Sequence, residues 1–186
     1  MQATIYVTDD EPAIRSAIVK RLSRRHHTVT GLESGEELVR AVTQHPPDLI
    51  LLDLKMPGMG GIEALRQIRP LAPQTLVIML TAYGTVENAV EAMRLGAYDF
   101  LIKSVDLSGV DPVVDRALEF LALRHRVEFA IAVQEVAAAR TDDREQLDRR
   151  GVPRQGDRPV GRSGAALVRV RAQFDPIGAV VLRATA

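Results

Sequence analysis

Short apolar runs alternate with longer amphipathic stretches up to about residue 125. Several of these runs are continuous in Ile, Val and Leu, as in "LILLD", instead of alternating apolar with polar positions. A strand that is apolar on both sides is typical of a sheet covered by helices on both faces. The pattern predicts five strands, Thr4–Thr8, Thr28–Gly31, Asp48–Asp53, Leu76–Thr81 and Asp99–Lys103.

The stretches between the runs carry apolar residues at helical spacing. After Pro12, which fits a first helical turn because no N–H bond is needed there, Ile18 and Leu22 fall on one face. Ser34 stands three residues before Glu37, which is the spacing of a capping box. We therefore expect helices from Pro12, from Ser34, over Gly60–Ile68, over Thr85–Leu95 and from Pro112 onward.

Strict alternation of strands and helices indicates parallel strands joined by right-handed crossovers. We predict an α/β fold, a flavodoxin-like doubly wound sheet of five parallel strands in the order 2-1-3-4-5, followed by a helical extension and a flexible tail. In such a sheet the functional crevice lies beyond the carboxyl ends of the strands, where the order reverses between the first and third strands.

Composition narrows the class of protein. The chain has 186 residues, 46% of them apolar, which suits one domain plus an extension. Lys+Arg and Asp+Glu both number 24, although acids outnumber bases up to residue 139 and arginines outnumber acids after it. The absence of cysteine excludes disulfides, thiol catalysis and zinc–thiolate sites. With no leader peptide or membrane-spanning run in the sequence, we expect a cytoplasmic protein without membrane contact.

Candidate chemistry gathers at the ends of the expected strands. Asp9 and Asp10 follow "IYVT", and Asp53 ends the third run within "LILLDLKMPGMGG". Acids at close range repel one another, and Mg2+ relieves this best because it takes a few carboxylates, water and a phosphate oxygen. The fourth strand ends in the hydroxyl of Thr81 and the fifth in the ammonium of Lys103. Together these groups can cradle a transferring phosphoryl group.

Residues 1 to about 123 resemble the receiver domain of bacterial two-component response regulators. The matching motifs are Asp9-Asp10, Asp53 with "KMPGMGG", Thr81-Ala82 and Lys103, each at its expected strand end. The stretch "LTAYGTVENAVEAMRLGAYDFLIK" is similar in particular to receivers of sigma-54-dependent activators of the nitrogen-regulation type.

This resemblance implies a phosphoacceptor site that uses Mg2+. Asp53 would take a phosphoryl group from the phosphohistidine of a sensor histidine kinase, and no multiple-turnover activity is expected. The implied ligands of Mg2+ are Asp9, partly through water, Asp10, Asp53 and the backbone carbonyl of Lys55. Thr81 would donate a hydrogen bond to the acyl phosphate, and Lys103 would pair with it.

The resemblance also implies a switch. Movement of Thr81 toward the phosphorylated site would allow Phe100 to turn inward. The surface expected to change is formed by Thr85–Leu95, Asp99–Lys103 and the helix from Pro112. We expect it to control partner binding or homodimerisation on phosphorylation, in transcriptional regulation. Ser104 replaces the proline that usually follows the lysine in this family, so the conformation of that loop is not predicted.

We divide the chain into a receiver domain at 1–123, a helical extension at 124–140 and a basic, flexible tail at 141–186. Residues at three- and four-residue spacing form a seam along the extension, namely Phe120, Leu123, Val127, Ala130, Gln134 and Ala137. This seam could pair with a second copy of the chain, or the helix could fold onto its own domain.

The tail has a composition typical of a solvated linker. "TDDREQLDRRGVPRQGDRPVGRSG" is polar and rich in arginine and glycine, and without aromatics or a helix-turn-helix pattern we expect no direct nucleic-acid binding. "RPVGRSGAALVRV" resembles the opening of the AAA+ ATPase domain that follows such receivers, but no G-x-x-x-x-G-K-[ST] motif comes after it. One interpretation of the tail is the remnant of a truncated output domain.

Two other classes of function stay open at this point. A phosphatase of the haloacid-dehalogenase kind also uses an aspartate nucleophile and Mg2+, but it requires a D-x-D motif after the first strand, and "TDDEP" lacks that spacing. A binding module that works without phosphorylation is suggested by Ser104. Turnover of a phosphate ester would favour the first, and failure of acetyl phosphate to label Asp53 would favour the second.

Overall fold

The computed structural model describes residues 2–82, 85–104, 107–149, 169–174 and 180–185, with side chains described as far as residue 135. The chain divides into two compact units, Met1–Leu123 and Arg124–Ala186. The elements, in chain order, are β1 (Thr4–Thr8), α1 (Pro12–Ser23), β2 (Thr28–Leu32), α2 (Gly35–Gln44), β3 (Leu49–Asp53), α3 (Gly61–Leu71), β4 (Leu76–Thr81), α4 (Val86–Arg94), β5 (Asp99–Ile102), α5 (Val110–Arg149), β6 (Arg169–Phe174) and β7 (Val180–Thr185).

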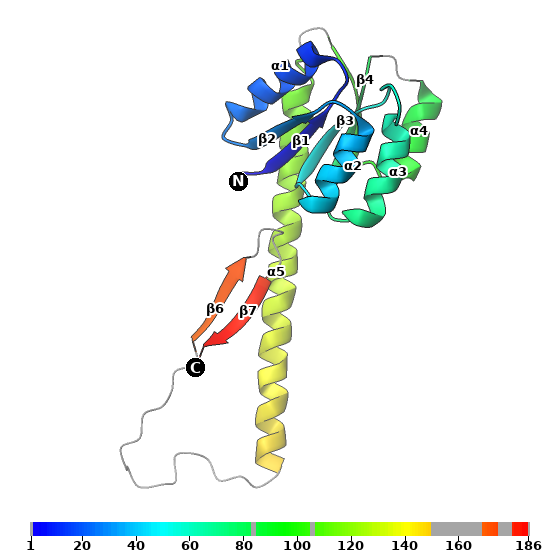
Figure 1. Cartoon of the computed structure of the whole chain (residues 1–186). Helices are drawn as coiled ribbons and strands as arrows, with labels where there is room; N and C mark the ends of the chain where they lie inside the picture. Colours follow the sequence, from blue (N-terminus) through cyan, green and yellow to red (C-terminus); the bar gives the residue numbers. More distant parts are fainter. Residues whose placement is uncertain (1, 83–84, 105–106, 150–168, 175–179, 186) are drawn as a thin grey trace. The chain divides into compact units, whose positions relative to one another are not determined.

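The first unit is built on a parallel sheet with the strand order β2-β1-β3-β4-β5 (Figure 1). This order confirms the fold predicted from the alternation of strands and helices. The register pairs Thr8 with Leu52, Asp53 with Leu80 and Thr81 with Ile102. The carboxyl ends of the four strands β1, β3, β4 and β5 therefore align at one edge of the sheet.

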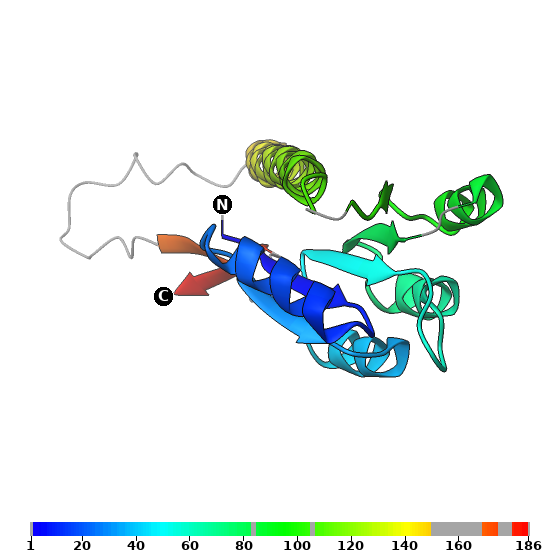
Figure 2. The same ribbon diagram turned by 90° about the horizontal axis from the view of Figure 1, so that it is seen from above.

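Helices cover both faces of the sheet, as the continuous apolar strands predict (Figure 2). One core lies under α1 and the start of α5 and includes Ile18, Leu22 and Val114. The other lies under α2, α3 and α4 and includes Leu38 and Leu65. Every residue of β3 is buried, because this strand lies between β1 and β4 with a core on each side.

Local signals in the sequence fix where several helices begin and end. The hydroxyl of Ser34 accepts a hydrogen bond from the Glu37 N–H at 3.2 Å, which starts α2 as the capping-box spacing predicts. Thr85 caps α4 in the same way through the Asn88 N–H. Gly96, with a φ of 89°, follows the end of α4 in the left-handed region that glycine adopts at little cost.

Two helices extend beyond their expected ends. α3 continues past Ile68 to Leu71 although Pro70 lies in its last turn, and the Ala72 N–H still bonds to the Ile68 carbonyl, so this turn closes around the proline. α5 runs to Arg149, beyond the residue 140 where we expected the helix to stop. Residues 141–149 contain neither glycine nor proline, and the first such residue is Gly151, so helix propensity does not fall before that point.

Within residues 141–186, the structure also describes an antiparallel pair of strands, β6 and β7, with Arg169 opposite Thr185. The alternation in this part of the sequence is consistent with strands. The divisions at 124–140 and 141–186, and the flexible character of the tail, stay predictions. In the part of the chain that the structure describes, no helix is both long and apolar enough to cross a bilayer.

Candidate phosphoacceptor site

The polar residues predicted to form the site lie at the edge of the sheet where the strands end. Asp9 directly follows β1, Asp53 is the last residue of β3, and Thr81 is the last residue of β4. Asp9, Asp53 and Thr81 are all buried, with 0%, 4% and 1% of their surface exposed. Buried polar groups need partners, which makes this edge chemically distinct from the surrounding apolar strands.

Main-chain groups hold Asp9 in place. Its N–H donates to the Leu32 carbonyl on β2, and its Oδ1 accepts a hydrogen bond from the Glu11 N–H at 3.0 Å. Its carbonyl accepts a hydrogen bond from the Arg15 guanidinium on α1. These contacts fix the loop between β1 and α1 and orient the carboxylate.

The three predicted acids converge. Asp9, Asp10 and Asp53 each offer one carboxylate oxygen, and these oxygens lie within 4.8 Å of one another. Lys103, just after β5, places its Nζ 2.8 Å from Asp9 Oδ2 and 2.9 Å from Asp53 Oδ1. The Lys103 side chain is only 6% exposed, so both ion pairs are shielded from water.

Burial and charge act in opposite directions on this cluster. Burial raises the pKa of the Asp53 carboxyl, and the hydrogen bond and charge of Lys103 partly offset that effect. Burial alone would lower the pKa of Lys103, but its bonds to Asp9 and Asp53 outweigh burial and raise it. Lys103 is therefore a permanent cation at neutral pH.

The donor set fits a hard divalent cation. Three carboxylates face one ammonium, so the cluster keeps an excess of negative charge and of oxygen ligands. Mg2+ prefers a small number of carboxylates completed by water and phosphate oxygens, and ligands of doubly wound sheets bind at the carboxyl ends of the strands, where this cluster lies.

The main chain of Asp53 lies in close contact with the start of α3. A Cβ atom at Gly61 would lie 2.1 Å from the Asp53 carbonyl oxygen, so only glycine fits there. The Leu54 N–H donates to the Leu80 carbonyl, and the Gly61 N–H donates to the Leu54 carbonyl. Lys55, two residues after Asp53, has an exposed side chain.

The two predicted switch residues lie on neighbouring strands, β4 and β5. Thr81 is buried, and its carbonyl accepts a hydrogen bond from the Lys103 N–H at 2.8 Å. Phe100 is half-buried and packs against the core under α2, α3 and α4. The structure thus brings Asp9, Asp10, Asp53 and Lys103 together, and Phe100 lies in the adjacent core.

Residues that support the site were missed by sequence reasoning. Arg15 reaches the Asp9 carbonyl from α1, and the Glu36 carboxylate on α2 accepts a hydrogen bond from the Met59 N–H in the loop after β3. Neither contact follows from periodicity, because Arg15 turns back to the loop that precedes its own helix and Glu36 reaches a loop 23 residues further along the chain. The signal in the sequence that could have indicated these contacts was a charged residue in the first turn of each helix, Arg15 in α1 and Glu36 in α2.

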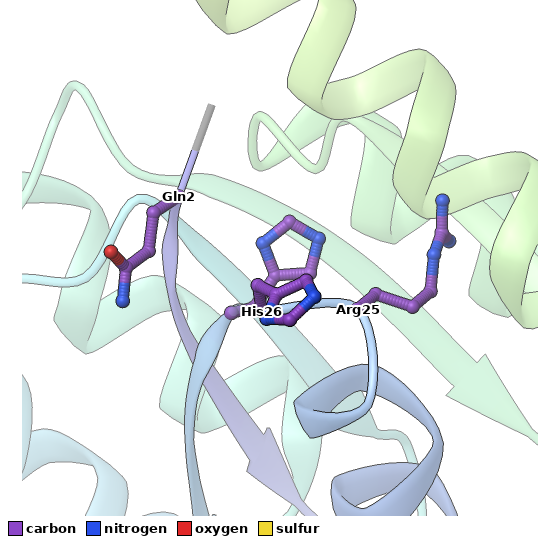
Figure 3. Close-up of a pocket in the computed structure, with 4 residues that line it drawn as sticks. Gln2, Arg25 and His26 are labelled. Atoms are coloured by element: carbon purple, nitrogen blue, oxygen red, sulfur yellow. The ribbon is translucent and has the colours of Figure 1, made fainter.

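A separate hollow lies at the amino ends of β1 and β2. It measures about 500 Å³ and is lined by Gln2, Arg25, His26 and His27 (Figure 3). Burial and then the charge of Arg25 lower the pKa of His27, whose neutral Nδ1 accepts the Ala3 N–H at 3.4 Å. Arg25 pairs with Asp111 and Asp115 on α5. This hollow is therefore no part of the acidic site at the carboxyl ends.

Comparison with known proteins agrees with the geometry. The family model of the response regulator receiver domain matches residues 5–114. The chain belongs to this family. Receivers accept a phosphoryl group in two-component systems, interact with sensor histidine kinases and bind Mg2+ at their acidic pocket, and the cluster of Asp9, Asp10 and Asp53 is compatible with that chemistry.

Several relatives of this receiver are transcriptional regulators. The chain is 34% identical over 123 residues to the regulatory protein AtoC of Escherichia coli, covering 66% of this chain and 27% of AtoC. It is 37% identical over 113 residues to the DNA-binding transcriptional regulator NtrC of Klebsiella pneumoniae, covering 61% of this chain and 24% of NtrC. The chain thus spans about a quarter of the length of these relatives.

Solved structures show the same fold. The crystal structure of NtrX from Brucella abortus, in complex with ATP, superposes with a TM-score of 0.64 at 33% identity, covering 69% of this chain and 29% of NtrX. A CheY-like receiver domain protein from Methanospirillum hungatei gives a TM-score of 0.64 at 25% identity, covering 67% of this chain and 99% of that protein.

Proposed function

We propose that Asp53 is the phosphoacceptor of this receiver. One Asp53 carboxylate oxygen attacks phosphorus of a kinase phosphohistidine, an O–P bond forms, and the P–N bond breaks with its electron pair leaving on the imidazole nitrogen. The product is an acyl phosphate. The observation that carries this proposal is the convergence of three carboxylate oxygens within 4.8 Å beside the Lys103 ammonium.

Asp10, Asp53 and the backbone carbonyl of Lys55 would hold Mg2+, with Asp9 contributing partly through water. When bound, the ion shields the carboxylates from a dianionic phosphoryl donor. The buried Lys103 ammonium, 2.9 Å from Asp53, would pair with the product, and the Thr81 hydroxyl would donate a hydrogen bond to it. Positioning by these groups supplies most of the catalysis, because a carboxylate is a weak nucleophile.

The proposed output is a change in the surface of α4, β5 and α5. Among the described residues of α4, Ala92 alone is buried, while Val86, Val90 and Met93 are 76%, 42% and 49% exposed. Ile102 on β5 is 60% exposed. Such a lightly anchored helix can shift at low cost when Thr81 and Phe100 move. We propose that this shift controls partner binding or homodimerisation, and through it transcription.

The test is intact-mass measurement of the full chain after treatment with acetyl phosphate and Mg2+. We expect one added phosphoryl group, absent without Mg2+ and absent in Asp53→Asn. A parallel assay with a generic phosphate ester should show no sustained turnover. Sustained turnover would favour a phosphatase, and an unlabelled wild-type chain would favour a module that works without phosphorylation.

A further inference from the structure

The loop that follows Asp53, residues 54–60, is anchored firmly at its two ends. The Leu54 N–H bonds to the Leu80 carbonyl at 2.8 Å, and the Leu54 carbonyl accepts the Gly61 N–H at 3.0 Å. The Leu54 and Met56 side chains are buried, with 7% and 8% of their surface exposed. Between these anchors the loop carries the backbone of Lys55, which belongs to the proposed metal site.

The middle of this loop is held from α2. The Met59 N–H donates to Glu36 Oε1 at 2.9 Å. This bond joins the loop to a residue 23 positions earlier in the sequence. Gly58 has a φ of 73°, and a Cβ atom there would lie 2.9 Å from Glu36 Oε1, so the carboxylate closely covers this turn.

Close packing brings Glu36 to the loop. Gly35 is buried, and a Cβ atom on it would lie 2.6 Å from the Met59 carbonyl oxygen, so the first turn of α2 directly contacts the loop. Glu36 occupies this first turn, where the helix dipole favours a negative charge. Hydrogen bonds from its own backbone N–H and then from Met59 lower the pKa of Glu36, so the bond to Met59 is charge-assisted at neutral pH.

We propose that Glu36 is a positioning residue for the phosphoacceptor site: its carboxylate fixes the loop after β3 and thereby the Lys55 carbonyl. The inference rests on the proposed function, since it assigns Glu36 to the Mg2+ site formed around Asp53. It acts through the main chain of Met59 and touches neither the ion nor the phosphoryl group.

The experiment compares Glu36→Ala, Glu36→Gln and Glu37→Ala in the full chain. Glu37 is a matched control, because it lies in the same turn and its carboxylate accepts the Glu33 N–H instead of reaching the loop. The measurements are the Mg2+ dissociation constant by calorimetry, amide hydrogen exchange of Met59 without metal, and stability in urea.

We expect Glu36→Ala to weaken Mg2+ binding by about threefold or more and to speed Met59 exchange by a similar factor, as loss of one net hydrogen bond implies. Glu36→Gln should recover part of the Mg2+ affinity and part of the protection of the Met59 N–H, since its amide oxygen can accept the same hydrogen bond. Glu37→Ala should change neither, although it lowers stability.

Wild-type affinity in Glu36→Ala, or an equal loss of affinity in Glu37→Ala, would overturn the positioning role. Either result would leave the phosphoacceptor proposal standing, provided that the wild-type chain binds Mg2+ and is labelled at Asp53. A wild-type chain that binds no Mg2+ would overturn both proposals.

Discussion

Among single residues, the clustered carboxylates of the site repel one another and so lower the stability of the folded protein, but the same cluster can bind a metal ion and a phosphoryl group. Asp9, Asp10 and Asp53 place carboxylate oxygens within 4.8 Å of one another, and Lys103 offsets only part of that charge. Proteins commonly retain such conflicts where function requires them. The sequence indicated these four residues because each lies at or just after the end of an apolar run predicted to be a strand, but the direct bonds from Lys103 to two carboxylates required the structure.

Asp10→Asn should stabilise the protein when Mg2+ is removed. The change deletes one of three like charges while keeping the shape of the side chain, so we expect unfolding in urea with EDTA to cost about 1 kcal/mol more than in the wild type. Adding Mg2+ should then stabilise the wild type more than the variant, because the ion binds the native wild type more tightly. A variant less stable than the wild type in EDTA would contradict this account.

At the scale of elements, the sequence predicted every strand and helix of the first unit with small errors at the ends. The Ser34 cap worked as a local signal because its hydrogen bond joins residues three apart in the sequence. The end of α3 was placed too early, because the helix continues through Pro70 to Leu71. Contacts between elements, such as the close approach of Gly61 to the Asp53 carbonyl oxygen, could not be predicted from the spacing of apolar residues.

Gly61→Ala should separate α3 from the end of β3. The new Cβ atom would overlap the Asp53 carbonyl oxygen and approach the Leu54 Cα to 3.0 Å, and neither backbone atom can move freely. We expect a loss of about 1–3 kcal/mol in unfolding free energy, together with weaker Mg2+ binding, because Asp53 moves with its main chain.

Gly60→Ala is the control for this substitution. A Cβ atom there would meet the Leu54 carbonyl oxygen at 3.6 Å, which is ordinary contact, and Gly60 has a negative φ of −69°. It should cost less than Gly61→Ala and leave Mg2+ binding unchanged. If the two variants lost equal unfolding free energy in urea titrations, the close approach of Gly61 to the Asp53 carbonyl oxygen would not explain the loss.

For the molecule as a whole, the alternation of strands and helices was the pattern that predicted both the sheet topology and the position of the acidic site. Once the strands are parallel and doubly wound, their carboxyl ends must meet, so the acidic site follows from topology. The bond from Glu36 to Met59 does not follow, because it depends on how closely α2 approaches a loop 23 residues away. The end of α5 was also missed. The polar composition of residues 141–149 favoured a linker, although none of these residues is a glycine or proline that would end a helix.

The seam along α5 bears on assembly. Leu123 and Val127, two apolar residues of this predicted seam, are 57% and 58% exposed. We predict that the full chain forms a homodimer on treatment with acetyl phosphate and Mg2+, and that Val127→Glu weakens this dimer about tenfold or more by placing a charge in the seam. Light scattering after size exclusion measures the mass.

Phe129→Glu is the matched variant, because Phe129 is 45% exposed on the same helix but lies outside the three- and four-residue spacing of the seam. If association is non-specific, both substitutions remove apolar surface and both lower the mass. If the seam pairs as a coiled coil, Phe129→Glu dimerises like the wild type while Val127→Glu dimerises about tenfold or more weakly. If Val127→Glu dimerised at the same protein concentration as the wild type, the interface would instead be assigned to the exposed residues of α4 and β5.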